Sequence, residues 1–417
     1  MTDTAEGAPS PDPPDPSTPA ASAPPAPRPP KQEQEPASEE ITMVAPNVIR
    51  MQLPIWMPGL GHVNMYGLLD ERGLAVVDPG LPGPSSWKAL KQRLKAAGFR
   101  VKDVHTVIVT HSHPDHFGGA GRIRKESGAE LVAHRAFTTW SLSESSRRNH
   151  LPSEQEALEA ERVAAAAAQA LDVWDDVEIP TIGDHTDDYA GDPLRDDPTP
   201  ELTARAQPWG GETPWGGSKH PMPKLTRRMA IKAMRLLFAP PDPSRRVRHA
   251  ERVRLAGRDW VSVHTPGHTI DHLCLYDPEY GLLISGDHVL PSITPHISGV
   301  GNGADALHSY IQTLDLVAAL DGVKLGLPAH GHPFADVPGR VEAIKEHHHE
   351  RMEQLAAASI AIGPATVQDL SHEIFPKKHW GVMAESETFA HLEHLVSEGR
   401  AERWTEGGRY FYRVGAA

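Results

Sequence analysis

Apolar runs of strand length alternate with helical segments along the first third of the folded sequence. Two helical segments lie between the runs. One is capped by Ser85 or Ser86 and ends at Gly98, and the other spans about 120–126 and ends at Gly128. The expected strands lie at 48–53, 63–69, 74–77, 107–109 and 131–133. This alternation predicts an α/β layered fold.

The same pattern returns in the second half of the chain. Strands are expected at 260–263, 273–276, 282–285 and 324–327. A long helix at about 341–360 then carries three consecutive histidines, 347–349. Since consecutive helical residues face different directions, this triplet is interpreted as part of a solvated face.

Residues 361–417 do not continue the alternation of strands and helices. A short helix through Val367 and Leu370 and a longer one at about 385–398 precede a hairpin around Gly407-Gly408. This order favours a winged-helix-like module. Residues 361–417 carry six Lys or Arg against eight Asp or Glu, so docking or homodimer formation is expected in preference to DNA binding.

Two segments interrupt the α/β pattern. Residues 1–40 are rich in Pro, Ala and Ser, and such a composition predicts a disordered tail with no role in the chemistry. Residues 135–250 are interpreted as an insertion into the main domain, 41–360, with helices at about 153–171 and 225–238. The insertion could cover a site. Its Met-rich second helix fits either a packed core or an apolar pocket wall.

Composition narrows the functional classes. The 417 residues carry a net charge of −14, which disfavours a nucleic-acid partner. Cys274 is the single cysteine and lies in an apolar strand, so it is expected to be a core residue. No apolar run reaches the roughly 20 residues of a membrane helix, and no secretory signal is evident. A cytoplasmic protein without membrane contact is the expectation.

The candidate chemistry centres on the sequence Thr-His-Ser-His-Pro-Asp-His directly after the apolar run 107–109. One histidine after a strand is usually a satisfied core or surface residue. Four imidazole or carboxylate groups within six residues instead indicate a metal site for zinc or a neighbouring transition metal. The candidate ligands of this cluster are His111, His113, Asp115 and His116.

Three later strands also lead into turns that bear His or Asp. The candidates there are His268 in Thr-Pro-Gly-His-Thr, Asp287 in Ser-Gly-Asp and His330 in Pro-Ala-His-Gly. Four further histidines near these turns are interpreted as structural or pocket-lining residues, namely His264, His288, His296 and His332.

Together with Asp78 at the end of the strand 74–77, these motifs resemble the metallo-β-lactamase superfamily in order and spacing. The resemblance implies an αββα sandwich with two divalent metal ions at one edge, most simply Zn²⁺, with Fe or Mn as alternatives. It assigns His111, His113 and His268 to the first ion. Asp115, His116 and His330 would hold the second ion, Asp287 would bridge them, and Asp78 would orient a histidine ligand.

Within the superfamily the sequence is most similar to the branch of glyoxalase II and β-lactamase-like protein 2. Class B β-lactamases typically have Cys at the position of Asp287, and flavodiiron proteins have Glu at that of His113, so both activities are disfavoured. The resemblance implies a hydrolase in which a metal-bridging hydroxide, oriented by Asp115, attacks the carbonyl of a thioester or ester of a small acyl substrate. A metal-dependent ribonuclease and a mono-iron persulfide dioxygenase remain the alternatives.

Overall fold

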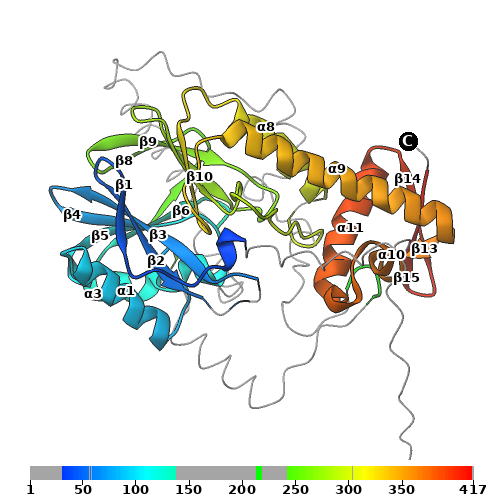
Figure 1. Cartoon of the computed structure of the whole chain (residues 1–417), viewed down its shortest axis with the longest axis horizontal. Helices are drawn as coiled ribbons and strands as arrows, with labels where there is room; N and C mark the ends of the chain where they lie inside the picture. Colours follow the sequence, from blue (N-terminus) through cyan, green and yellow to red (C-terminus); the bar gives the residue numbers. More distant parts are fainter. Residues whose placement is uncertain are drawn as a thin grey trace, which may run out of the picture. The chain divides into compact units, whose positions relative to one another are not determined.

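A computed structural model of the chain describes residues 31–55, 57, 59–137, 213–217, 242–302 and 304–415. The helices predicted at about 153–171 and 225–238 lie outside these residues. Within the described chain, two β-sheets and the helices on their outer faces form the main body (Figure 1).

The first sheet has seven strands in sequence order. They are β1 (Ile41–Ala45), β2 (Val48–Pro54), β3 (His62–Asp70), β4 (Gly73–Val77), β5 (Val104–Val109), β6 (Glu130–His134) and β7 (Arg245–Val247). The pairs from β1 to β4 are antiparallel, and β4 to β7 pair in parallel. The strands β2 to β6, which the apolar runs predicted, are mostly buried, because both faces of this sheet are covered.

The second sheet has five strands in the order β12-β11-β10-β9-β8. They are β8 (Arg252–Leu255), β9 (Arg258–His264), β10 (Leu273–Asp277), β11 (Leu282–Gly286) and β12 (Leu325–Pro328). The strands β9, β11 and β12 run in one direction, since β10 pairs antiparallel with β9 and β11, and β11 pairs parallel with β12. Their C-terminal ends therefore meet at one edge.

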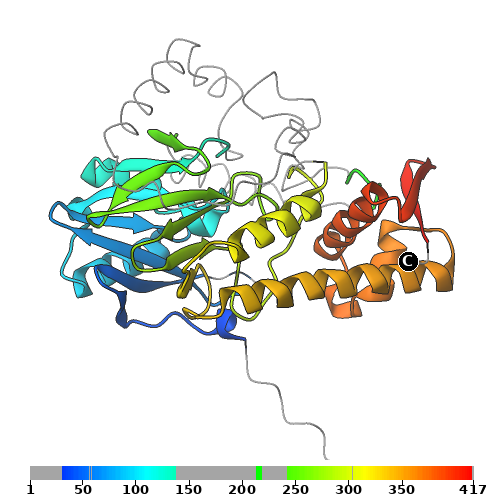
Figure 2. The same ribbon diagram turned by 90° about the horizontal axis from the view of Figure 1, so that it is seen from above.

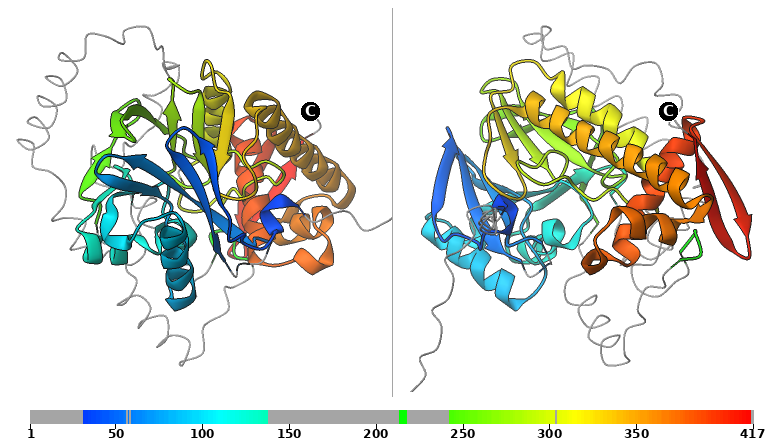
Figure 3. Two further views of the ribbon diagram at one scale, coloured as in Figure 1. Left: turned by 60° about the vertical axis from the view of Figure 1, so that its left-hand side comes forward. Right: turned by 45° about the vertical axis from the view of Figure 1, so that its right-hand side comes forward.

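Three apolar cores show the order of the layers. The helices α1 (Pro84–Ala96) and α3 (Ala120–Ser127) pack on the outer face of the first sheet through side chains such as Leu90 and Ile123. Side chains such as Val77 and Trp260 fill the space between the sheets. The helices α8 (Ala306–Ala318) and α9 (Val337–Ile362) lie side by side on the outer face of the second sheet (Figure 3). The predicted αββα order is thus observed.

The helix α9 extends beyond the second sheet and its end joins the C-terminal elements (Figure 2). These are β13 (Ala365–Thr366), α10 (Val367–Ile374), the short 3-10 helix η4 (Lys377–His379), α11 (Val382–Ser397), β14 (Ala401–Glu406) and β15 (Arg409–Val414). The last two strands form the predicted hairpin, and β13 adds to β15 to make a three-stranded sheet. Apolar side chains of α9, α10 and α11 form a separate core with β15.

Residues 31–40, which the sequence analysis placed in a disordered tail, include a 3-10 helix, η1 (Gln32–Gln34). Glu33 is fully buried, and its carboxylate accepts hydrogen bonds from the backbone amides of Ser292 and Ile293 and from the Ser292 hydroxyl. These contacts hold the segment against a loop more than 250 residues away. Composition alone could not reveal these contacts. The predicted end of the disordered tail at residue 40 therefore lies too far along the chain, because residues 31–40 are already part of the folded structure.

The predicted insertion 135–250 also contains parts of the folded body. The strand β7 completes the first sheet beside β6. Residues 213–217 pack on the C-terminal elements, where Trp215 is buried and its indole N–H donates to Glu385 Oε2 at 2.8 Å. These two stretches are therefore part of the folded body, although they lie within the limits predicted for the insertion.

The sequence predicted that Cys274 is buried and that the histidine triplet 347–349 is exposed, and the structure tests both predictions. Cys274 is buried in β10, as predicted, and burial raises the pKa of its thiol to about 12. The expectation of a solvated histidine triplet is wrong for His348, which is buried and whose Nδ1 lies 3.0 Å from His391 Nε2 in α11. At this point α9 packs on α8 and α11, where the His348 ring lies beside Tyr310 and His391, so one member of the triplet faces inward. No helix in the described part of the chain is long and apolar enough to span a membrane.

Candidate metal centre

All seven candidate ligands gather at the edge where strands of both sheets end. His111 and His113 follow β5, and the adjoining short helix α2 (Pro114–Phe117) carries Asp115 and His116. The other three come from the second sheet, where His268 follows β9, Asp287 follows β11 and His330 follows β12. Parallel strands deliver their C-terminal turns to one side, so the repeated strand-then-ligand pattern in the sequence becomes one cluster.

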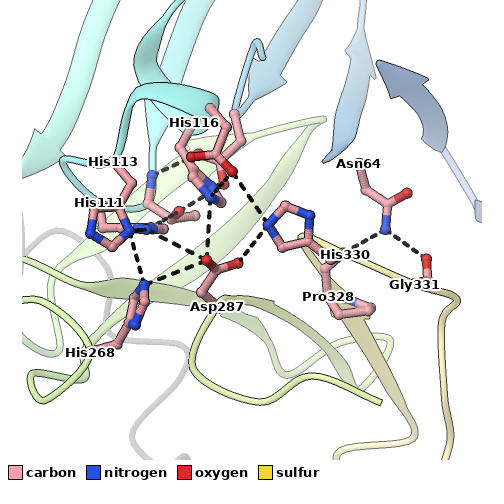
Figure 4. Close-up of polar contacts among 12 residues, drawn as sticks. Asn64, His111, His113, His116, His268, Asp287, Pro328, His330 and Gly331 are labelled. Atoms are coloured by element: carbon pink, nitrogen blue, oxygen red, sulfur yellow. Dashed lines mark hydrogen bonds and ion pairs between the residues drawn. The ribbon is translucent and has the colours of Figure 1, made fainter. Parts of the chain in front are cut away.

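The first group consists of His111, His113 and His268. The Nδ1 atom of His113 lies 3.0 Å from Nε2 of His111 and 3.0 Å from Nε2 of His268. Two nitrogens bound to one tetrahedral zinc at 2.0–2.1 Å would lie about 3.3 Å apart. The three rings thus point their nitrogens at a common point, as Figure 4 shows.

The second group consists of Asp115, His116 and His330, all of which are buried. Oδ2 of Asp115 lies 3.5 Å from Nε2 of His116 and 3.5 Å from Nε2 of His330. This group offers one carboxylate and two imidazoles, which is a suitable donor set for a second ion of the same kind.

Asp287 lies between the two groups (Figure 4). Its Oδ2 is 3.7 Å from His111 Nε2, 3.5 Å from His268 Nε2 and 3.5 Å from His116 Nε2. Its other oxygen, Oδ1, is 3.3 Å from His330 Nε2. A single carboxylate therefore reaches donors of both groups.

The histidines are oriented by hydrogen bonds at their other ring nitrogens. Nδ1 of His116 lies 2.8 Å from Oδ2 of Asp78, whose carboxylate also accepts from the backbone amide and the hydroxyl of Thr110. This contact agrees with the expectation that Asp78 orients a histidine ligand. Nδ1 of His330 bonds to the carbonyl of His62 at 2.6 Å, and Nδ1 of His268 bonds to the carbonyl of His296 at 2.8 Å. Such partners fix the ring and leave Nε2 for a metal.

Two histidines near the site were missed by the sequence analysis. His62 supports His330 through its carbonyl, and His272 accepts a hydrogen bond from the amide of Asp287 at 3.1 Å. Neither forms a motif with the ligands in sequence, so no pattern identified them. Gly286 explains part of this packing: its φ is 53°, and a Cβ there would lie 2.6 Å from His272 Nε2.

The histidine pKa values shift in opposite directions in the two groups. Burial lowers the pKa of His111 well below its usual value and that of His113 to about 3. Burial also acts to lower the pKa values of His116 and His330, but the nearby carboxylates of Asp287 and Asp115 outweigh it and raise both. The same pairing holds the pKa of Asp115 at about 2 against the effect of burial.

Several buried polar atoms at the centre make ion-pair contacts with one another but no hydrogen bond of normal geometry among the described residues. They are Nε2 of His116, Nε2 of His330 and Oδ1 of Asp287. Buried polar groups are nearly always satisfied, and these three face the space between the groups. Two divalent cations would satisfy them, so the donor set fits the implied metals.

The four histidines expected to be structural make other contacts. The side chain of His264 bonds to the Ile270 carbonyl, that of His296 approaches Glu387, and that of His332 pairs with Glu35, while His288 is buried beside Tyr310. A separate group of Asp305, His308 and His394 also lies close together. Asp305 there caps α8 through the amide of His308 and pairs with Nδ1 of His394, so helix capping accounts for it.

The raised pKa values predict a pH dependence for the second ion. Metal-free His116 and His330 keep their protons to a higher pH than an ordinary histidine, and a metal must displace these protons, whereas the lowered pKa values of His111 and His113 favour their neutral forms. Zn²⁺ affinity at the second group should therefore rise between pH 6 and 8, by up to about tenfold per unit for each proton released. Titration calorimetry in two buffers of different ionisation enthalpy measures the release. Equal pH slopes for both ions would contradict the expectation.

Known proteins share the fold over nearly the whole chain. The crystal structure of a metallo-beta-lactamase family protein from Thermus thermophilus is 28% identical, with a TM-score of 0.61, over 89% of this chain and all of that one. A beta-lactamase domain protein from Burkholderia ambifaria, 24% identical, matches with a TM-score of 0.62 over 91% of this chain and 96% of that one. The second likeness concerns the fold alone.

Curated relatives match over a shorter region. The lactamase-like protein vrtG of Penicillium aethiopicum is 32% identical over 126 residues, which are 29% of this chain and 38% of the relative. The lactamase-like protein nscB of Trichophyton rubrum is 29% identical over 154 residues, 36% of this chain and 43% of the relative. The chain thus spans about two-fifths of the length of these relatives.

The family model of the metallo-beta-lactamase superfamily matches residues 58–330, a range that contains all seven candidate ligands and most strands of both sheets. The chain therefore belongs to the metallo-beta-lactamase superfamily.

Proposed function

We propose that this protein is a metal-dependent hydrolase that cleaves the thioester or ester bond of a small acyl substrate. The observation that carries the proposal is the arrangement of seven buried or half-buried donors in two groups that share Asp287. His111, His113 and His268 would hold one divalent ion, and Asp115, His116 and His330 the other. Zinc suits this set of imidazoles and carboxylates, and Fe and Mn are alternatives.

Two divalent ions bound at such a centre supply Lewis acidity and activate water near neutral pH. The protein contributes position and charge. Asp115 is ionised, because its pKa is about 2, and its carboxylate lies at the second group, where it can also orient a nucleophilic water. The contacts of Asp78, His62 and His296 hold three imidazoles in fixed orientations before substrate arrives.

A thioester or ester is proposed because such a carbonyl needs only an activated water and a polarised oxygen, and two divalent ions held by this centre would supply both. From the resemblance of the ligand motifs we also propose that the chain belongs to the glyoxalase II-like branch of the superfamily. The net charge of −14 argues against the ribonuclease alternative. A local basic patch, Arg227-Arg228 to Lys232, could offset this charge, and it lies outside the described residues. The second donor group argues against a mono-iron persulfide dioxygenase.

For the C-terminal elements we propose a winged-helix-like module that serves docking or homodimer formation. Its two helices and three-stranded sheet, with β13-β15-β14 order, support this assignment. The cytoplasm is the proposed location.

A substrate panel tests the function. Zinc-replete protein is offered acyl-CoA and hydroxyacylglutathione thioesters, a lactone, a β-lactam, a phosphodiester and single-stranded RNA. Turnover of a thioester or ester, lost with a chelator and restored by Zn²⁺, is expected. Failure with every thioester and ester would refute the proposal. RNA cleavage would replace it with the ribonuclease alternative. Protein purified without added zinc that contains one iron per chain and forms sulfite from a persulfide would replace it with the persulfide dioxygenase alternative.

A further inference from the structure

The loop at 291–302 connects the candidate metal centre with the C-terminal helix α11. It is seated closely on that helix. A Cβ on Gly299 would lie 2.6 Å from Phe389 Cδ1 and 2.9 Å from the Ala390 backbone nitrogen. The hydroxyls of Ser298 and Ser386 are 3.0 Å apart, and the Gly299 amide donates to the Ser386 carbonyl at 3.5 Å. The course of this loop therefore depends on the position of α11.

The same loop holds His268 of the first group from two sides. The carbonyl of His296 accepts the hydrogen bond from Nδ1 of the His268 ring at 2.8 Å. The side-chain amide of Asn302 donates to the His268 carbonyl at 3.0 Å. The orientations of the ring and of its backbone are thus set by one loop, and these contacts leave His268 Nε2 directed at the first group.

Glu387 of α11 fixes the His296 side chain. Its Oε2 lies 3.5 Å from His296 Nδ1, and its Oε1 lies 3.9 Å from Nε of Arg351 in α9. Its backbone carbonyl accepts a hydrogen bond from Nδ1 of His391 on the next turn at 2.7 Å. Glu387 is thus itself held between two helices, and it can restrain the residue whose carbonyl orients His268.

We propose that Glu387 and Ser386 are positioning residues for the first metal ion. They act through the 291–302 loop on the orientation of His268, so that the C-terminal elements set how tightly that ion is bound. The inference rests on the proposed metal centre and is independent of the identity of the substrate. Loss of a direct partner of a metal ligand typically changes metal affinity by about 10- to 100-fold; Glu387 and Ser386 act one step further away, so we expect effects at or below the lower end of that range.

The test compares Glu387→Gln with Glu393→Gln in the full chain. Both glutamates lie on α11 with similar exposure, but Glu393 pairs with Arg403 and Tyr412 within the C-terminal elements. Zn²⁺ affinity is measured by competition with a chromophoric chelator. Each substitution is also placed in an Asp115→Asn background, where the first ion alone is expected to bind. Glu387→Gln should weaken that ion about tenfold, and Glu393→Gln should leave its affinity unchanged.

Ser386→Ala provides a second variant that removes a hydroxyl contact without changing charge. A loss of about threefold in the same direction is expected. Substitution with Co²⁺ gives a readout that general destabilisation would not move, because the visible absorption of the ion at the first group should shift in Glu387→Gln and not in Glu393→Gln. Unchanged affinity in Glu387→Gln and Ser386→Ala, or equal losses in Glu387→Gln and Glu393→Gln, would overturn the inference. A protein that binds two ions but hydrolyses no thioester or ester would refute the proposed function and leave this inference standing.

Discussion

Asp115→Asn should lower kcat on a thioester substrate by about 10³-fold and leave one metal ion bound per chain where the wild-type protein binds two. The substitution keeps the shape of the side chain but removes its charge. Asp115 supplies the carboxylate of the second group, at 3.5 Å from both His116 Nε2 and His330 Nε2. A loss of about 10³-fold corresponds to about 4 kcal/mol of transition-state stabilisation. Elemental analysis and steady-state kinetics on the same preparation measure both effects.

Asp103→Asn is the matched control for this prediction. Its carboxylate lies at the surface, where it pairs with Arg100 at 3.0 Å, so the same chemical change should leave metal content and kcat near their wild-type values. Full activity in Asp115→Asn with two ions bound would show that this carboxylate neither holds the second ion nor orients the nucleophile. A loss of both ions would assign Asp115 to the whole centre.

The positions of the candidate ligands could be predicted from the sequence because a local rule places each of them. His111, His268 and Asp287 follow apolar strands, and the turn after a strand lies at the edge of its sheet. When the strands run in one direction, as β9, β11 and β12 do, every such turn lies at the same edge. The pattern of strand and turn therefore predicts the cluster without knowledge of any contact.

The supports of the ligands could not be predicted in this way. The carbonyl of His62 orients His330 from 268 residues away, and the carboxylate of Glu33 holds the 291–302 loop from 259 residues away. A backbone carbonyl carries no sequence signal, since every residue has one. Glu33 lies in a stretch whose composition indicates disorder, and only its burial under that loop gives it a fixed place.

The predicted limits of the insertion and the predicted exposure of the histidine triplet were wrong for a related reason. The strand β7, Arg245–Val247, lies inside the segment interpreted as an insertion, because a three-residue strand with two arginines has no apolar run to identify it. Pairing with β6 determines its structure. His348 likewise became buried through its contact with His391, a residue of a different helix. The strand conformation of β7 and the burial of His348 thus depend on tertiary contacts, which the local sequence pattern does not contain.

Asp287→Asn should have a different effect on metal content from Asp115→Asn, and the difference tests the shared carboxylate. Among the described residues, Asp287 is the carboxylate that approaches donors of both groups, with Oδ2 at 3.5 Å from His268 Nε2 and Oδ1 at 3.3 Å from His330 Nε2. Its loss should weaken both ions, so that the purified variant retains less than one ion per chain. Activity should fall at least as far as in Asp115→Asn, by about 10³-fold or more.

Asp287→Asn should also change the number of protons that are released when Zn²⁺ binds. Asp287 is the first of the carboxylates that raise the pKa of His116 and of His330 against the effect of burial. With that charge removed, both pKa values should fall, and the metal-free protein at pH 7 should hold fewer protons at the second group. Zn²⁺ binding should then release fewer protons than in the wild type. Asp315→Asn, which removes a surface charge paired with Lys345, should change neither quantity. If Asp287→Asn kept two ions and wild-type proton release, the two groups would be independent sites, because a carboxylate that joins them must affect both when its charge is lost.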